Sequence, residues 1–214
     1  MKNILTLFFA LLLLLSAVGL ALPQTPIKAR TESGKDVILS PDGTWKYVSE
    51  SEPHPRNTSA MTKPAGAKAV YKARYGGFSV WYDDTKWIQS AQPDEEGRLE
   101  FRLKRGDGYG IVIVEELGMP TSTLKELALE NAVSAAPDAK IVFEETRMVN
   151  GKEILCLKIE GSVKEIPFRY FGYYHGGKNG SIQVITFTGT QIFGKYEQDF
   201  LEFLNGLQID EAKP

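Results

Sequence analysis

Apolar and polar residues alternate along several stretches of the chain, which is the pattern of strands that bury one face. In residues 98–104 the alternation is strict, so that Leu99, Phe101 and Leu103 point to one side and charged residues to the other. The run 110–114 is apolar on both sides, as expected of a strand nearer the centre of a sheet. These segments predict two strands of one sheet.

Turns that contain glycine separate the other apolar runs and indicate that consecutive strands pair as hairpins. Asn150-Gly151 and the Gly-rich segment 176–180 are the clearest of these turns. Further strands are expected over these segments: 70–74, 78–82, 140–148, 153–160, 164–175 and 181–188. Strands joined by hairpins form an antiparallel sheet.

Two segments carry apolar residues at helical spacing. The first opens with Thr123 and Glu126, which form a capping-box pattern, and ends before a proline. The second opens near Thr190 and ends at Gly206, a typical C-terminal cap. Residues 69–210 are therefore predicted to form one α+β domain, an antiparallel β-sheet covered by two amphipathic helices in an α/β/α sandwich.

Residues 1–21 have the three regions of an export signal. Lys2 precedes an apolar run that begins at Ile4, and small residues lead to a cleavage position after Ala21. A retained membrane anchor is the alternative, because the apolar segment approaches the ~20 residues that span a bilayer. No second apolar run of that length follows, so we expect a periplasmic or secreted protein that has no stable membrane insertion after cleavage.

Residues 22–49 are predicted to form a small β-hairpin unit of short strands around two Gly-containing turns. Trp45 and Tyr47 alternate with a lysine, so their rings share one side of the last strand and are candidate binding residues. The same rings could instead dock the unit onto the rest of the chain. Residues 50–68 are rich in Pro and small polar residues without periodicity, and are predicted to be a linker.

The composition excludes several classes of function. The chain has 25 Lys and Arg against 27 Asp and Glu, so it lacks the basic excess of a protein that binds nucleic acid. A single cysteine allows no intramolecular disulfide, and two distant histidines form no common zinc pattern. Neighbouring acidic residues lack the spacing of a calcium loop. We therefore expect no metal and no cofactor.

Cys156 and His175 are the one pair of side chains that could supply a nucleophile and its base. A lone cysteine in an apolar strand is usually a small buried side chain. The sequence contains no nucleophile elbow, phosphate-binding loop or dinucleotide fingerprint. A Cys-dependent hydrolase is therefore the least favoured function, and we expect a protein that is not an enzyme.

The strand 164–175 carries aromatic residues on both faces. The side that includes Phe168 is predicted to be core. Phe171 and Tyr173 point to the other side, close to Arg169. If that side is bare, it has the composition of a recognition surface, so these three residues join Trp45 and Tyr47 as candidate binding residues.

The order of the elements resembles the PsbP-like fold. The resemblance rests on the run 77–82 followed by Asp84-Thr85-Lys86-Trp87, on paired strands, a helix and a four-strand meander, and on a closing aromatic helix at 196–204. It covers residues 69–209. The fold is shared by photosystem PsbP, the yeast Ran-binding nuclear-import factor and periplasmic proteins such as DcrB. The resemblance implies an accessory or binding role and carries over no individual site residue.

Two non-catalytic functions remain open on the sequence. The first is an exported accessory module that binds another protein of the cell envelope. The second is a small-ligand carrier with a pocket between the sheet and the helix 123–136, whose Ala-rich stripe leaves room for a ligand. A buried apolar cavity would favour the carrier, and a bare Tyr-rich face would favour the accessory module.

Overall fold

The computed structural model describes residues 27–30, 36–40, 45–47, 56–89 and 98–210. By contacts within the chain it divides into two compact units, 1–49 and 50–214. In the first unit, a three-stranded antiparallel sheet has the order β1-β2-β3. The bounds of its strands are β1 Ile27–Arg30, β2 Asp36–Leu39 and β3 Trp45–Tyr47. These are three short strands at the predicted places, whereas the predicted signal segment lies outside the described residues.

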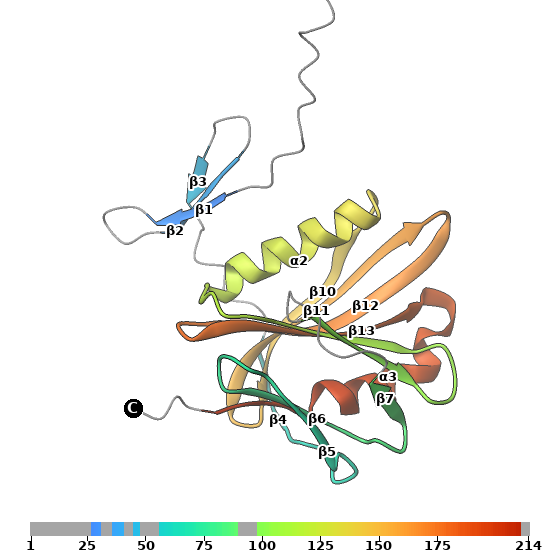
Figure 1. The fold of residues 1–214 in the computed structure, drawn as a ribbon. Helices are drawn as coiled ribbons and strands as arrows, with labels where there is room; N and C mark the ends of the chain where they lie inside the picture. Colours follow the sequence, from blue (N-terminus) through green and yellow to red (C-terminus); the bar gives the residue numbers. More distant parts are fainter. Residues whose placement is uncertain (1–26, 31–35, 41–44, 48–55, 90–97, 211–214) are drawn as a thin grey trace, which may run out of the picture. The chain divides into compact units, whose positions relative to one another are not determined.

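The larger unit is built on an eight-stranded sheet with the order β4-β10-β11-β12-β13-β9-β8-β7 (Figure 1). All its neighbours are antiparallel except β4, which runs parallel to β10. The bounds are β4 Arg56–Met61, β7 Trp87–Gln89, β8 Arg98–Leu103, β9 Tyr109–Glu115, β10 Lys140–Val149, β11 Lys152–Val163, β12 Ile166–Gly177 and β13 Gly180–Gly189. The predicted large antiparallel sheet is therefore present.

Strand β4 differs from the linker that was predicted over residues 50–68. Its sequence is polar and four of its six residues are exposed, so it has no apolar period of its own. Its position is set instead by pairing with β10 across a long sequence separation. Such an edge strand has no local signal in the sequence.

A second, smaller sheet has the order β14-β6-β5, in which β5 is Ala69–Lys72, β6 is Phe78–Tyr82 and β14 is Leu207–Ile209. The sequence predicted β5 and β6 in the main sheet and no strand after Gly206, and both expectations are wrong. The cause lies at Gly206, because a Cβ there would be 1.7 Å from the carbonyl oxygen of Trp81. The chain can pass β6 this closely only with glycine, and it then continues as a strand.

The two helices cover opposite faces of the large sheet. Helix α2, Thr121–Ala135, packs on β10, β11 and β12, whereas α3, Phe193–Leu204, packs on β12, β13 and β6 (Figure 1). A short 3-10 helix, η1, Thr190–Ile192, precedes α3. Alternate residues of β11 and β12 enter the two cores, so that Tyr174 lies in the core under α2 and Tyr173 in the core under α3. The fold is α+β, mostly sheet with two helices.

The predicted capping box at the start of α2 is not formed. The helix begins at Thr121, two residues before Thr123, and its N-cap Pro120 makes no side-chain bond. The Thr121 hydroxyl instead accepts a hydrogen bond of 3.1 Å from the backbone N–H of Gly176, which joins the helix start to β12. This contact with the sheet sets where the helix begins.

Candidate functional site

A cleft of about 470 Å³ lies between α2 and the large sheet. Its size falls within the range of about 300–1,000 Å³ that is common for ligand pockets. It is where the sequence predicted a pocket for a small ligand. The lining residues come from β8, β9, β11, β12, β13 and α2: Arg98, Ile111, Ile113, Glu115, Ala128, Asn131, Ala132, Ala135, Ile159, Tyr170, Tyr174, Gln183 and Ile185.

The small side chains of α2 leave this space open. Ala128, Ala132 and Ala135 line the cleft from the helix. The helix packs on β10 to β12, while the cleft also extends over β9 and β13. A larger residue at the Ala132 position would project into the cleft.

The register of the strands orders the cleft floor into rows. Ile113 lies opposite Gln183, and Gln183 lies opposite Tyr174. The neighbouring row contains Ile111, Ile185 and a glycine, Gly172. Glycine is required there because a Cβ at Gly172 would be 2.8 Å from the Tyr174 hydroxyl oxygen, so the tyrosine ring lies back over its own strand.

Two polar groups are buried in the floor without a protein partner. Gln183 is 4% exposed and Tyr174 is 1% exposed. Burial raises the pKa of the Tyr174 hydroxyl, which therefore stays protonated. Within the part of the chain that the structure describes, neither the Gln183 amide nor the Tyr174 hydroxyl forms a hydrogen bond. Both side chains line the cleft, so their polar atoms are open to water or to a ligand.

Two charged residues, Arg98 and Glu115, also line the cleft. Arg98 lies opposite Ile113 and its guanidinium contacts the Glu100 carboxylate at 3.0 Å. Glu115 lies opposite Ser181, whose hydroxyl donates a hydrogen bond of 3.0 Å to the carboxylate. One charge of each sign therefore borders the buried polar pair.

A row of aromatic rings lies next to the cleft. Tyr109 and Phe187 stack with centroids 5.3 Å apart, and Phe187 meets Tyr170 edge-on at 5.3 Å. The ring centroids of Tyr170 and Phe168 are 4.7 Å apart. Tyr109 is 43% exposed, so this row of rings reaches the surface. Of these four rings, that of Tyr170 lines the cleft.

The face of β12 that was a candidate recognition surface is not bare in the structure. Phe171 is 2% exposed and Tyr173 is fully buried, both in the core under α3. Tyr173 donates a hydrogen bond of 2.9 Å to the Asn205 side chain and accepts one of 3.2 Å from Arg147, and burial raises its pKa to about 12. The face that carries Phe168 was predicted to be core, and its Tyr174 lies in the core under α2; the same face also borders the cleft.

Arg169 is also engaged by the protein. Its guanidinium forms an ion pair with Glu160 and lies 4.7 Å from the centroid of the Phe193 ring. Of the five candidate binding residues, these three of β12 therefore have partners within the fold. In the first unit, β3 places Trp45 opposite Leu39 and Tyr47 opposite Val37, and their binding role stays a prediction.

The site residues that the sequence did not single out are Gln183 and the isoleucines of β9 and β13. A signal was present at Gln183, because it is one polar residue within the apolar run 182–185. A strand buried on both faces has no need of such a residue. The isoleucines gave no signal, because a core strand and a cleft floor have the same composition.

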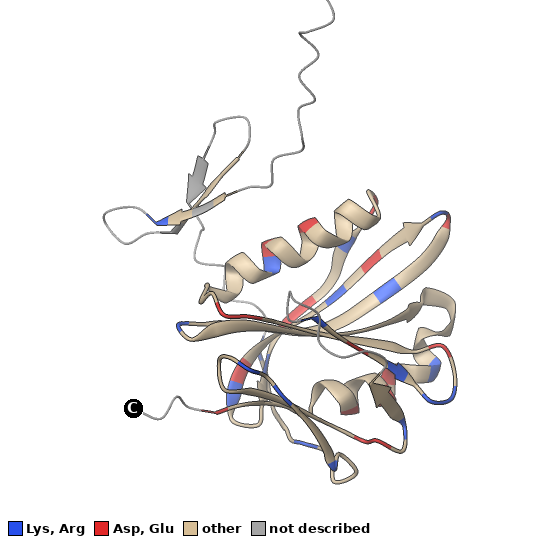
Figure 2. Cartoon of the chain, viewed as in Figure 1, with Lys and Arg blue, Asp and Glu red and all other residues tan. Residues whose placement is uncertain are grey.

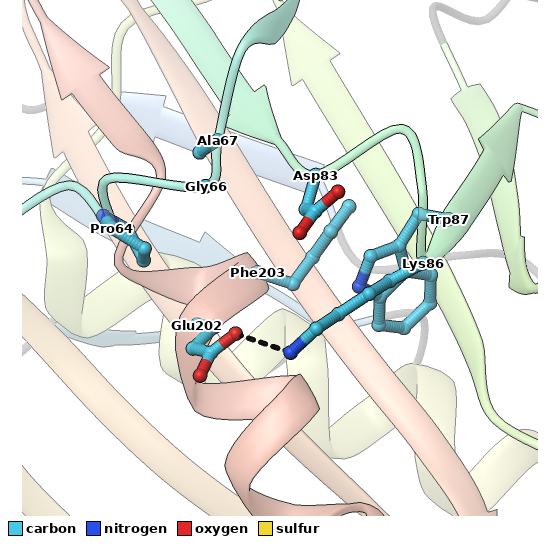
Figure 3. A pocket seen from close by; sticks show the side chains of 8 residues that line it. All are labelled: Pro64, Gly66, Ala67, Asp83, Lys86, Trp87, Glu202 and Phe203. Carbon is cyan, nitrogen blue, oxygen red and sulfur yellow. Dashed lines mark hydrogen bonds and ion pairs between the residues drawn. The ribbon is translucent and has the colours of Figure 1, made fainter.

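Two other hollows hold paired charges. One of about 10 Å³ has room for about one water and is lined by Lys86 and Glu202 (Figure 3). The Lys86 ammonium donates a hydrogen bond of 2.7 Å to Glu202 and another of 2.8 Å to Asp199. These partners raise the pKa of Lys86, and the contact ties the start of β7 to α3. The other, of about 350 Å³, contains Lys158 in an ion pair of 2.6 Å with Glu197.

The Cys–His pair lacks the chemistry of a nucleophile. Cys156 is fully buried and burial raises the pKa of its thiol to about 12, so the thiolate is not accessible near neutral pH. The ring of His175 packs edge-on against Phe78 at 6.2 Å, and burial lowers its pKa. Within the described ranges, no cluster of three or more His, Cys, Asp or Glu could hold a metal ion.

The charged residues and the hydropathy of the helices were compared along the larger unit. Basic and acidic residues are interspersed along the elements of the larger unit (Figure 2). Among the described residues, no helix combines the length and hydropathy that are needed to cross a bilayer.

Comparisons with known proteins identify the fold. Neither the models of known protein families nor the curated proteins include a match to this chain. Among solved structures, the cyanobacterial PsbP (CyanoP) of Synechocystis sp. PCC 6803 superposes with a TM-score of 0.53 at 14% identity, over 69% of this chain and 95% of that one. PA94, a protein of unknown function from Pseudomonas aeruginosa, has a TM-score of 0.48 at 11% identity, over 67% and 98%. The chain has a PsbP-like fold, as the order of its elements predicted.

Proposed function

From this PsbP-like fold, we propose that the chain is a non-catalytic accessory module whose principal binding site is the cleft under α2. The single observation that carries the proposal is a cleft of about 470 Å³ whose floor contains two buried polar side chains, Gln183 and Tyr174, without partners among the described residues. Such a combination of apolar walls and few oriented polar groups is typical of ligand sites.

The N-terminal pattern supports a place of action outside the cytoplasm. Residues 1–21 have the charged, apolar and small-residue regions of an export signal. The proposed setting is therefore the cell envelope. Expression of the full chain, followed by N-terminal sequencing of the product from the extracellular or periplasmic fraction, tests this part. Protein that starts at Met1 in the cytoplasmic fraction would contradict it.

Binding of an environment-sensitive apolar dye tests the cleft. N-phenyl-1-naphthylamine is uncharged and gains fluorescence on leaving water, so titration of the purified protein should give saturable enhancement. Ala132→Phe fills the cleft from α2 and should abolish it. Val133→Phe is the matched control, because Val133 lies on the same helix but is 39% exposed and does not line the cleft.

The two variants separate binding in the cleft from adsorption elsewhere. Equal dye binding by wild type and Ala132→Phe, with both proteins folded by circular dichroism, would overturn the proposal. Loss of binding in Val133→Phe as well would indicate that the dye reports the helix surface and not the cleft.

A second candidate function is the docking of another envelope protein through the small N-terminal unit. Its support is that β1, β2 and β3 form a sheet of their own within a separate compact unit. Trp45 and Tyr47 remain the proposed contact residues. A chain that lacks residues 22–55 retains β4 and its pairing with β10, so it is the appropriate truncation.

Cross-linking and pull-down from native envelope extract compare this truncation with the full mature chain. A specific partner lost on truncation, while dye binding in the cleft persists, would support docking through the N-terminal unit. The same partner captured by both chains would contradict it.

A further inference from the structure

We propose that the cleft binds an uncharged amphiphile, an aliphatic chain that carries a hydroxyl or amide head group. The head would lie against Gln183 and Tyr174, and the chain would lie over the isoleucines toward Tyr170. This inference rests on the proposed function, because it names the ligand class of the same cleft.

The buried polar pair defines the head group. The Gln183 amide offers two N–H donors and one carbonyl acceptor, and the Tyr174 hydroxyl offers a donor and an acceptor. The two residues are opposite each other in the register of β12 and β13, and the Tyr174 ring lies back toward Gly172. The proposed head group would therefore lie between the Gln183 amide and the Tyr174 hydroxyl. A hydroxyl or primary amide both donates and accepts, so it can form hydrogen bonds with both groups in place of water.

The charges around the cleft oppose an ionised head. An anion placed there would gain a neighbouring cation in Arg98, but that guanidinium already contacts Glu100 at 3.0 Å. The same anion would also face the carboxylate of Glu115, and a cation would face Arg98. Because burying a charge without a dedicated partner costs far more than burying a neutral polar group, an uncharged head is favoured.

The apolar lining of the cleft sets the length of the ligand's aliphatic chain. Ile111, Ile185 and Ile159 line the cleft beyond the polar pair, together with the Tyr170 ring. From Tyr174 to Tyr170, which both line the cleft, the strand advances four residues, or about 13 Å. An extended chain of roughly ten carbons has this length, since its C–C bonds are about 1.5 Å long and zigzag along the axis.

The volume favours a single small molecule over a protein segment. A cleft of about 470 Å³ holds a ligand of ordinary drug size. An α-helix with side chains is about 10–12 Å across, and even two turns of one need more space than this. The occupant is therefore a small amphiphile and not a docked helix.

Isothermal titration calorimetry on the full mature protein tests the head-group preference with four ligands of equal chain length. Decanamide and decanol should bind, and decanoate and decyltrimethylammonium should bind at least tenfold more weakly. Gln183→Leu should weaken decanamide about tenfold, because one or two hydrogen bonds are lost. Tyr174→Phe, which removes only the hydroxyl, should weaken it several-fold. Gln191→Leu, at an exposed position of η1, is the control and should leave all four affinities unchanged.

The outcomes separate this inference from the function on which it rests. If the naphthylamine dye binds in the cleft but decanoate binds as well as decanamide, the head-group inference is wrong and the binding function stands. If Gln183→Leu and Tyr174→Phe both leave decanamide affinity unchanged, the head does not lie at this pair and the inference is wrong. If the dye itself fails to bind wild type, the proposed function fails.

Discussion

Asn150 ties together three parts of the larger unit, and its replacement by alanine should destabilise that unit strongly. Its side-chain amide donates hydrogen bonds of 2.9 Å to the Asn205 carbonyl and 2.7 Å to the Leu207 carbonyl. Its side-chain oxygen accepts one of 2.8 Å from the backbone N–H of Lys63. One residue thus joins the β10–β11 turn to the end of α3, to β14 and to the segment after β4.

The magnitude follows from these bonds and from the backbone. Three hydrogen bonds contribute about 1 kcal/mol each, and their loss leaves two carbonyls and one N–H without their side-chain partner. Asn150 also has φ of 47°, a conformation in which alanine costs about 1 kcal/mol more than glycine. We therefore expect Asn150→Ala to lower the free energy of unfolding by about 4 kcal/mol, and Asn150→Gly by about 3 kcal/mol.

Urea denaturation followed by circular dichroism measures both variants. Asn179→Ala is the matched control, because Asn179 lies in the β12–β13 turn and is exposed, and it should change the free energy of unfolding by less than about 0.5 kcal/mol. A loss below about 1 kcal/mol for Asn150→Ala would show that water replaces the amide at these backbone groups, and the reasoning would be wrong.

Two further predictions concern the buried thiol of Cys156 and the ion pairs that Lys86 forms with α3. Cys156 should not react with iodoacetamide in native protein at pH 8 and should react fully in urea, because the thiol is buried and burial raises its pKa to about 12. Mass spectrometry measures the alkylation, and rapid alkylation of the native protein would contradict the burial of Cys156. Lys86→Met should cost about 1 kcal/mol of stability near neutral pH, because two partly exposed ion pairs are lost. Lys86 lowers the pKa of Glu202 from its ordinary value of 4.5, so the ion pair stabilises the fold above that pH. The difference in unfolding free energy between wild type and Lys86→Met should therefore shrink as the pH falls through the lowered pKa. A difference that does not depend on pH in urea titrations would refute this.

The elements that were predicted correctly are those whose signals are local. The alternation at 98–104 gave the correct buried face, since Leu99, Phe101 and Leu103 are all at most 3% exposed. Asn150-Gly151 forms the predicted turn, with positive φ at both residues. Both patterns act over a few residues, so the sequence contains the whole of the information.

The errors concern pairings between distant segments and the choice between two apolar faces. Nothing near β6 indicates that it pairs with β14, because the partners Val80 and Leu207 are far apart in the chain. Both faces of β12 are aromatic, so the sequence could not decide which face α3 would cover with its phenylalanines. The cleft was predicted from the alanines of α2, but its polar floor depends on the register that places Tyr174 opposite Gln183.

The buried amide of Gln183 links the proposed function to stability. The amide forms no hydrogen bond with the described protein, so leucine at this 4% exposed position would bury apolar surface without breaking one. We therefore expect Gln183→Leu to stabilise the ligand-free protein by about 1 kcal/mol, or about 2–4 °C in melting temperature for a unit of this size.

Differential scanning calorimetry compares Gln183→Leu with wild type and with Gln191→Leu, which should lie within about 0.5 kcal/mol of wild type. A loss of 1 kcal/mol or more in Gln183→Leu would show that the amide is satisfied in the ligand-free protein, and the argument for a head group at this place would fall. A gain in stability together with the loss of decanamide binding would mean that the fold gives up stability at Gln183 in order to keep a polar contact for its ligand, as functional sites commonly do.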